Sequence, residues 1–418
     1  VLENSRFMTD KERDFNFQAF NYDAANGVKN DGVPMRAVLD KKGKLQCNFM
    51  SGAHSLVIGA TGSGKTTTFI NPMIQLIAAA EKGSSMIMTD PKGELLDLHS
   101  AFLVEKGYDV KVLDLRDTYS SSRWNPLGGI WDSYQEYLKA GEGIIAHRDD
   151  FDNYSELQLM DEKIPANGEL WIEWQGKAFS DPTHCQDEVA VAKQRIYDEM
   201  YEDLNDLISV ICPVENEKDP LWEKGARSII MATCLAMLED SEDPRLGMTK
   251  EKFNFFNLNK ALTNSENEFK ALKEYFQGRS PLSQAVTLSR QVLSAAEATR
   301  ASYMSIAFDK LSMFNDRGLC GLTSATDINA AQFAQRPTAL FMKIPDEKDT
   351  RHGLAAVFVL CMYKALIKVA SAREDLSLPR NVYFILDEFG NMPKIEKFDK
   401  MITVGRSRKI WFNMVVQS

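Results

Sequence analysis

The sequence predicts an α/β fold: a mostly parallel sheet into which an all-helical domain is inserted. Near both ends of the chain, short apolar runs alternate with helical stretches, which is typical of a parallel sheet. In the middle, long stretches carry apolar residues every three or four positions and lack such strands. We therefore expect residues 1–128 and 323–418 to form one domain, and residues 129–322 to form the insertion.

The first 50 residues are polar and rich in turn residues, and a β-hairpin is expected there. Two strand-like runs, residues 35–39 and 45–50, flank the turn sequence Asp40-Lys41-Lys42-Gly43. The apolar run 55–58 follows as a short buried strand. Residues 66–80 are then predicted to be a helix, which Pro72 should kink or shorten because proline cannot donate a backbone hydrogen bond.

A glycine-rich segment connects this strand to this helix. It fits the nucleotide-binding P-loop at every fixed position: Gly59, Ala60, Thr61, Gly62, Ser63, Gly64, Lys65 and Thr66. Glycines let backbone N–H groups approach phosphates closely, and the helix that follows directs its N-terminal amides, including that of Thr67, at the same anion. We expect Lys65 to reach the β- and γ-phosphates of ATP and Thr66 to bind Mg²⁺. The alternative is a glycine-rich turn that matches by chance.

Four further runs are predicted to complete the sheet, namely residues 85–90, 110–115, 338–344 and 381–386. The last of them ends in Asp387 and Glu388, as a Walker B strand does. Asp387 would hold Mg²⁺ and Glu388 would polarise the attacking water. An acidic strand end without function is the alternative.

A final strand, residues 409–417, should lie between the P-loop strand and the Walker B strand. Its polar end residue, Gln417, is placed to sense the γ-phosphate, although it could also be an ordinary polar residue at a strand end. The basic turn before this strand contains Arg406 and Arg408. Either could be an arginine finger that acts on the neighbouring subunit of a ring, with Arg406 the first candidate; both could also belong to a solvated cluster.

Charge and composition limit the kinds of partner and of site that this protein can have. The net charge is −10, but residues 129–322 hold 20 Lys and Arg against 34 Asp and Glu, so the remaining segments are slightly basic. The acidic insertion suits basic protein partners better than phosphates, or it is only a solvated surface. Six cysteines without paired spacing favour reduced thiols over a zinc site or disulfides. The longest apolar runs are shorter than the roughly 18 residues that a membrane helix needs.

The ordered set of motifs resembles the type IV coupling proteins, the TraG-like and VirD-type ATPases of conjugation and type IV secretion. The resemblance covers essentially the whole chain and departs at Gly390, where alanine is expected more often. The matching segments are the P-loop, Asp90-Pro91-Lys92-Gly93-Glu94, Trp124-Asn125-Pro126-Leu127, residues 222–227, residues 386–395, residues 405–410 and Gln417.

The resemblance implies a RecA-like P-loop domain and a hexameric ATPase that uses ATP and Mg²⁺. It implies recruitment of a relaxase with its single-stranded DNA (the relaxosome), or of secreted protein substrates, and delivery to other components of the secretion channel. It further implies a position at the cytoplasmic face of the cell membrane, through a membrane segment preceding Val1. Asp90, Lys92 and Glu94 follow a strand end and should lie near the nucleotide or the pore, although Lys92 could be a surface lysine.

Two functional hypotheses remain open. In the first, the protein is a motor whose ATP hydrolysis drives DNA and attached protein through the ring. In the second, it is a receptor that docks proteins on its helical domain and uses nucleotide as a switch, without acting as a DNA motor. A helicase is a weaker third possibility because motifs beyond those of ring ATPases are not found.

Overall fold

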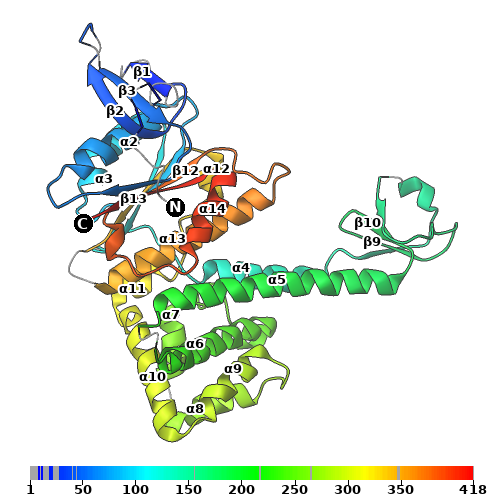
Figure 1. Cartoon of the computed structure of the whole chain (residues 1–418). Coiled ribbons are helices and arrows are strands. Elements are labelled where there is room, and N and C mark those ends of the chain that lie inside the picture. The colour runs from blue at the N-terminus through cyan, green and yellow to red at the C-terminus, as the bar shows by residue number, and fades with distance from the viewer. Residues whose placement is uncertain are drawn as a thin grey trace.

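The computed structural model describes residues 8–9, 11–12, 18–21, 28–39, 41–43, 45–154, 156–215, 218–263, 266–345 and 349–417. Three parts are visible in Figure 1: a sheet domain with a small additional sheet above it, a helical region below it, and a small β-structure at the end of a long helix. The predicted combination of a parallel sheet and inserted helices is confirmed.

Six parallel strands form the central sheet. In sheet order they are β4 (Ser55–Ile58), β13 (Ile410–Val416), β12 (Val382–Leu386), β5 (Ser85–Thr89), β11 (Thr338–Lys343) and β6 (Asp109–Asp114). The expected position of the last strand, between the P-loop strand and the Walker B strand, is confirmed. Because all six strands run in the same direction, their carboxyl ends meet at one edge of the sheet.

Both faces of the inner strands are buried, as strand β12 illustrates. In β4, at the edge of the sheet, Leu56 and Ile58 are 57% and 63% exposed, so the expectation of a buried strand at residues 55–58 is wrong. Its alternate residues Tyr383 and Ile385 pack with η1 (Thr66–Ile70), α2 (Asn71–Ala79) and α3 (Glu94–Glu105). Phe384 and its neighbours on the other face pack with α12 (Ala330–Gln335), α13 (Asp349–Ser371) and α14 (Phe398–Ser407). A strand covered on both sides has no polar face, which explains the continuous apolar runs in the sequence.

The predicted disturbance at Pro72 is confirmed. The chain forms a short π-helix, η1, and the α-helix α2 starts only at Asn71, with Pro72 in its first turn. Proline fits there because the first N–H groups of a helix have no intrahelical partner.

A three-stranded antiparallel sheet precedes the P-loop strand. Its order is β1 (Gln18–Asn21), β3 (Leu45–Met50) and β2 (Val33–Leu39), and β2 and β3 form the predicted hairpin. Asp40, in the turn, lies outside the described residues.

The helical region shares its core with the sheet domain. Its helices are α4 (Gly128–Lys139), α5 (Pro182–Ile211), α6 (Leu221–Glu239), α7 (Phe255–Thr263), α8 (Glu266–Gln277), α9 (Gln284–Leu293), α10 (Glu297–Leu311) and α11 (Arg317–Leu322). Helices α9 and α10 are separate, and Ser294 ends α9 by bonding back to the carbonyl of Arg290. The boundaries expected at 128/129 and 322/323 stay predictions.

The insertion is not helical throughout. The 42 residues between α4 and α5, 140–181, form a small sheet that we call the tip module, because α5 carries it away from the rest of the molecule (Figure 1). Its strands, in sheet order, are β7 (Ile145–His147), β9 (Trp171–Trp174), β10 (Lys177–Phe179) and β8 (Gln158–Leu159). Strands of two to four residues are too short for an alternating pattern to be recognised in the sequence.

Helix α13 is the one helix among the described residues that is apolar and long enough to cross a membrane, over residues Arg351–Ser371. Its mean hydropathy there is 1.9. Leu354, Val357 and Phe358 are fully or almost fully buried in the main core. Packing between the sheet and the helical region therefore accounts for its apolar composition.

Candidate functional site

A cavity of about 330 Å³ lies at the edge where the carboxyl ends of the parallel strands meet. Four segments that are distant in sequence line it: the P-loop, the turn after β5, the end of β12 and the end of β13. The lining residues are Thr61 to Thr67, Asp90, Pro91, Lys92, Glu94, Leu95, Asp387, Glu388, Val415, Val416 and Gln417. The fold therefore brings the predicted P-loop, Walker B pair and sensor residue together.

The P-loop backbone has the shape of an anion cradle. Gly62 and Gly64 have φ angles of +75° and +81°, which favour glycine. A Cβ atom at Gly59 would lie 2.7 Å from the Ser63 hydroxyl oxygen, so a side chain there would fill the loop. The Gly59 N–H donates to the carbonyl of Val416 at 3.2 Å, which fixes the loop to β13. These constraints fit a site that wraps backbone N–H groups around phosphates.

Lys65 lies inside this loop. Its ammonium group donates to the carbonyl oxygens of Gly59, at 2.6 Å, and Ala60, at 3.0 Å. Thr66 starts the first helical turn directly after it, so its hydroxyl and the helix N-terminus lie at the same point of the cavity. A positive charge, a hydroxyl and free N–H groups form a donor set suited to a triphosphate with Mg²⁺.

Asp387 and Glu388 follow β12 on the opposite wall. Thr89 of the neighbouring strand donates to the Asp387 carbonyl at 2.8 Å, and Asp387 Oδ1 accepts the Glu388 N–H at 2.9 Å. Burial raises the pKa of Asp387, and the nearby Lys65 and Lys92 oppose this shift. The buried carboxylate therefore lacks full compensation for its negative charge, as expected of a metal ligand.

Glu388 has a left-handed backbone, with φ +53°. For a residue other than glycine such a conformation costs about 1–3 kcal/mol, and it is often found at functional sites. Asn391 donates to its carboxylate at 3.3 Å. The strained turn directs the Glu388 side chain into the cavity lining.

Gln417 completes the edge. Its amide donates to the hydroxyl of Thr61, so the end of β13 is tied to the tip of the P-loop. The Gln417 side chain lines the cavity, as a γ-phosphate sensor would; that role stays a prediction.

Arg406 and Arg408 lie at the other end of the same strand. Arg406 is exposed in the last turn of α14, and Arg408 follows just before β13 begins, whereas Gln417 follows the end of β13. Neither arginine lines the P-loop cavity. Both arginines are therefore remote from this chain's own phosphate site, and their role as an arginine finger for a neighbouring subunit stays a prediction.

The turn after β5 is held by Asp90, which the sequence singled out, and by Arg116, which it did not. Arg116 donates to the carbonyls of Pro91 and, at 3.3 Å, Lys92, while Asp90 caps α3 by accepting the N–H groups of Leu95 and Leu96. Lys92 itself lines the cavity. The position of Arg116 shortly after a strand end was the one sign in the sequence that it lies near the site. Its bonds to backbone carbonyls are not revealed by any sequence motif.

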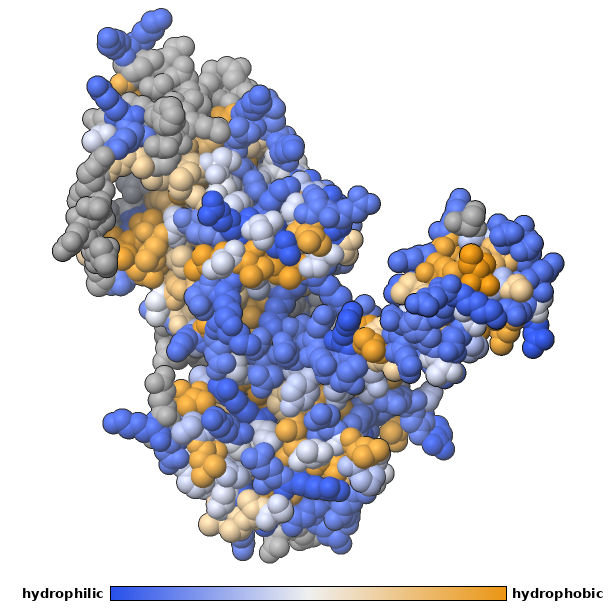
Figure 2. Space-filling model, turned by 45° about the vertical axis from the view of Figure 1, so that its right-hand side comes forward, coloured by the Kyte–Doolittle hydropathy of each residue, from blue (hydrophilic) through white to orange (hydrophobic). Residues whose placement is uncertain are grey.

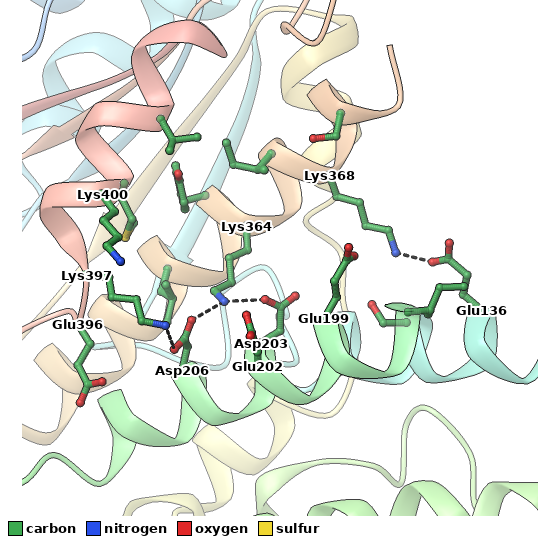
Figure 3. A pocket seen from close by; sticks show the side chains of 18 residues that line it. Glu136, Glu199, Glu202, Asp203, Asp206, Lys364, Lys368, Glu396, Lys397 and Lys400 are labelled. Atoms are coloured by element: carbon green, nitrogen blue, oxygen red, sulfur yellow. Dashed lines mark hydrogen bonds and ion pairs between the residues drawn. The ribbon is translucent and has the colours of Figure 1, made fainter. Parts of the chain in front are cut away.

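A second cavity, of about 460 Å³, lies between the sheet domain and α5. In Figure 3, Lys364 of α13 and Lys397 of the segment before α14 point at carboxylates of α5. Lys364 contacts Asp203 at 2.6 Å and Asp206 at 2.7 Å, and Lys397 contacts Asp206 at 3.4 Å. These charges pair with one another across the junction, so this cavity is a contact between domains, whereas the P-loop cavity presents free backbone donors.

Comparisons with known proteins agree with this geometry. A family model described as type IV secretory system conjugative DNA transfer matches residues 16–155 and 175–418. The plasmid coupling protein TrwB in complex with the ATP analogue ADPNP superposes with a TM-score of 0.50 at 14% identity, over 87% of this chain and 64% of that one. TrwB with ADP and Mg²⁺ gives 0.50 at 13% identity over the same shares.

This chain therefore spans less than two thirds of the TrwB chain to which it is similar. At this identity the likeness establishes the fold, a RecA-like domain with an inserted helical domain. A comparison with curated protein sequences gives no match. Because the family model covers most of the chain, the protein belongs to the conjugative DNA transfer family of type IV secretion systems, the coupling proteins.

Proposed function

We propose that this protein binds ATP with Mg²⁺ and hydrolyses ATP to move DNA, with any attached protein, into a conjugation channel. One observation carries the proposal: three distant segments bring Lys65, Asp387, Glu388 and Gln417 to one cavity in a chain of the conjugative DNA transfer family. The TrwB complexes with ADPNP and with ADP and Mg²⁺ support the choice of ligand.

Each residue has a defined task in this proposal. The P-loop N–H groups and Lys65 bind the phosphates, and Thr66 and Asp387 hold Mg²⁺, which neutralises charge on the transferred phosphoryl group. Glu388 accepts hydrogen bonds from the attacking water and polarises it, and Gln417 contacts the γ-phosphate side of the cavity. The rate gain comes from positioning and charge stabilisation.

The proposal includes a ring. Arg406, or Arg408 in its place, reaches the phosphate cavity of the neighbouring subunit, because it is remote from its own cavity. We infer that this ring is a homo-hexamer at the cytoplasmic side of the membrane. It receives a relaxase with single-stranded DNA and passes both to the channel.

Exchange of Glu388 for glutamine tests the catalytic assignment. Glu388→Gln keeps the shape of the side chain but removes the carboxylate, so ATP turnover with single-stranded DNA should fall by about 10²-fold or more while ATP binding persists. Turnover is measured by phosphate release and binding by a fluorescent ATP analogue. The matched control is Glu374→Gln, an exposed loop residue remote from the cavity, which should turn over normally.

Unchanged turnover in Glu388→Gln would remove Glu388 from the mechanism. A chain that binds ATP but shows no turnover at ring-forming concentrations, with or without DNA, would instead favour the nucleotide-switched receptor. The acidic character of the helical region, with 20 basic and 34 acidic residues over positions 129–322, is the observation that keeps this second function in consideration.

A further inference from the structure

The tip module is a separate structural unit on the arm made by α5. Its packing cluster consists of module residues, among them Ile172, Trp174 and Phe179, and of residues from the first turns of α5, such as Cys185 and Val189. The family model does not match residues 156–174, which include β8 and β9. An addition to a family scaffold, held away from the body, is a place where a chain-specific partner can bind.

One edge of the module is apolar and unpaired. Strand β7 is at the edge of its sheet, where its only pairing in the described structure is with β9. Ile144 and Ile145 are 45% and 49% exposed, and Ile164 and Leu170 are also exposed. Figure 2 shows apolar residues gathered on the visible face of the module. Edge strands are usually protected by charged residues or proline, because an open edge accepts another strand.

The edge is held in a defined position. His147 at the end of β7 stacks on Trp171 of β9, with ring centroids 4.1 Å apart and an interplanar angle of 13°. The same imidazole bonds to Glu173 at 2.9 Å, and the rings of Phe151 and Tyr154 pack edge-on against Trp171. Because Trp171 is fully buried by these contacts, β7 presents a rigid surface that loses little entropy on binding.

The charge of the module defines the partner. Residues 140–181 contain ten Asp and Glu and three Lys and Arg, a net charge of −7 in a protein of net charge −10. Glu142 lies three residues before β7, and Asp149 and Asp150 follow Arg148 after its end. Such a surface repels nucleic acid phosphates and attracts a basic protein segment.

We propose that the tip module binds a basic, extended segment of a partner protein, which adds a strand to β7. The backbone of the segment pairs with the open edge, its apolar side chains contact Ile144 and Ile145, and its lysines or arginines face the carboxylates around them. This proposal rests on the function proposed above, since it assigns cargo or accessory-protein capture to the arm and nucleotide chemistry to the sheet domain.

A peptide-binding measurement on the full chain tests it. The probe is a fluorescein-labelled peptide of alternating lysine and valine, compared with a peptide of alternating glutamate and valine and with single-stranded DNA of similar length. Fluorescence anisotropy should show binding of the lysine peptide alone at the tip. The double variant Ile144→Lys with Ile145→Lys should weaken it by about tenfold or more, which corresponds to roughly 1.4 kcal/mol. Leu282→Lys, at a residue that is 93% exposed outside the module, is the matched control and should bind like the original chain.

A second variant protects the test against misfolding. Glu142→Gln with Glu156→Gln leaves the apolar edge intact and removes two exposed charges. It should weaken binding several-fold at low salt and less at high salt. The proposal is overturned if both variants bind the lysine peptide normally, or if the isoleucine variant loses DNA binding instead. A fall in self-association of the isoleucine variant, measured by sedimentation, with unchanged peptide binding would assign the edge to a second copy of the chain and also overturn it.

ATP turnover separates this proposal from the function on which it rests. The isoleucine variant should hydrolyse ATP at the original rate, and Glu388→Gln should bind the lysine peptide with the original affinity. If the original chain hydrolyses ATP but does not prefer the lysine peptide over the glutamate peptide, only the docking proposal fails. If the lysine peptide binds at the tip but neither the original chain nor any variant hydrolyses ATP, only the motor proposal fails.

Discussion

The sheet domain and the tip module organise their polar residues in opposite ways. In the sheet domain, strands buried on both faces gather residues from four distant segments around one cavity, and the chemistry is concentrated there. In the tip module, a small sheet packs against the start of α5 and leaves an apolar edge in a segment that carries ten acidic residues, most of them exposed. The first arrangement suits a reaction and the second suits contact with another molecule.

Helix α5 connects these two units, and substitutions should affect them differently. At its carboxyl end, α5 shares the main core with the sheet domain and forms ion pairs to it; at its amino end it contributes to a small separate core. Changes at the sheet edge should therefore alter turnover, changes at the base of α5 should alter overall stability, and changes at the tip should stay local.

Removal of Arg406 is the change with the largest expected effect. It tests whether the sheet domain can hydrolyse ATP without a residue from a neighbouring subunit. If Arg406 acts on the neighbouring subunit, Arg406→Ala should lower turnover by about 10³-fold or more and leave ATP binding intact, because an arginine finger stabilises charge only in the transition state. Mixing Arg406→Ala with Lys65→Ala should restore part of the turnover, since some interfaces then combine an intact P-loop with an intact arginine. Phosphate release from each variant and from the mixture is the measurement.

Arg408→Ala is the comparison variant. Arg408 is half-buried and its Nε atom is buried without a hydrogen-bond partner within the described part of the chain, whereas Arg406 is exposed. If the mixture with Lys65→Ala regains turnover for Arg408→Ala and not for Arg406→Ala, the finger is Arg408. If neither mixture regains turnover, neither arginine acts on a neighbouring subunit, and both belong to the solvated cluster that is the alternative.

Much of the sheet domain could be predicted from the sequence because its strands are continuous apolar runs and its functional residues follow them directly. Gly59 to Thr66, Asp387 and Gln417 were recognisable for this reason. Arg116 was not, because it acts through backbone carbonyls of a turn that only the folded chain brings near. The tip module was missed for another reason: its strands are too short to show a period, and its core depends on Trp171 and Trp174, whose partners the sequence does not indicate.

Loss of Lys364 tests whether the sheet domain and the base of α5 form one unit. Burial lowers the pKa of this lysine, but its ion pairs with Asp203 and Asp206 outweigh that effect and raise it. Lys364→Ala leaves Asp203 without this counter-charge and Asp206 with only the longer contact to Lys397, so the free energy of unfolding should fall by about 1–3 kcal/mol. Urea denaturation followed by circular dichroism measures the change.

Lys368→Ala is the matched control, on the same helix one turn away. Lys368 and its partner Glu136 are both more than half exposed, so its loss should change the free energy of unfolding by about 0–1 kcal/mol. Equal effects of the two substitutions would show that the junction is held by the shared apolar core alone and that the paired charges contribute little.

The ion pair between His184 and Asp161 should produce the smallest effect, confined to the tip module. The hydrogen bond to Asp161 raises the pKa of His184. Burial acts to raise the pKa of Asp161, but hydrogen bonds from His184, Asp181 and Ser180 outweigh it, so the pKa lies below its usual value. A histidine whose pKa is raised by folding stabilises the folded state at pH values below its pKa in the unfolded chain. An aspartate whose pKa is lowered by folding stabilises the folded state at pH values above its pKa in the unfolded chain. The contribution is therefore complete between about pH 4 and pH 6.5. It is lost as the pH rises through the raised pKa of His184, and again as the pH falls through the lowered pKa of Asp161.

Hydrogen exchange of residues 171–179, corrected for the intrinsic dependence on pH, should accordingly show weaker protection at pH 8.5 than at pH 5.5. Exchange in α6, in the main core, should show no such change because the module has its own packing cluster. His184→Gln should remove the difference between the two pH values. If α6 loses protection together with the module as the pH rises, the tip is coupled to the body through α5, and a partner captured at β7 could then be sensed at the junction with the sheet domain.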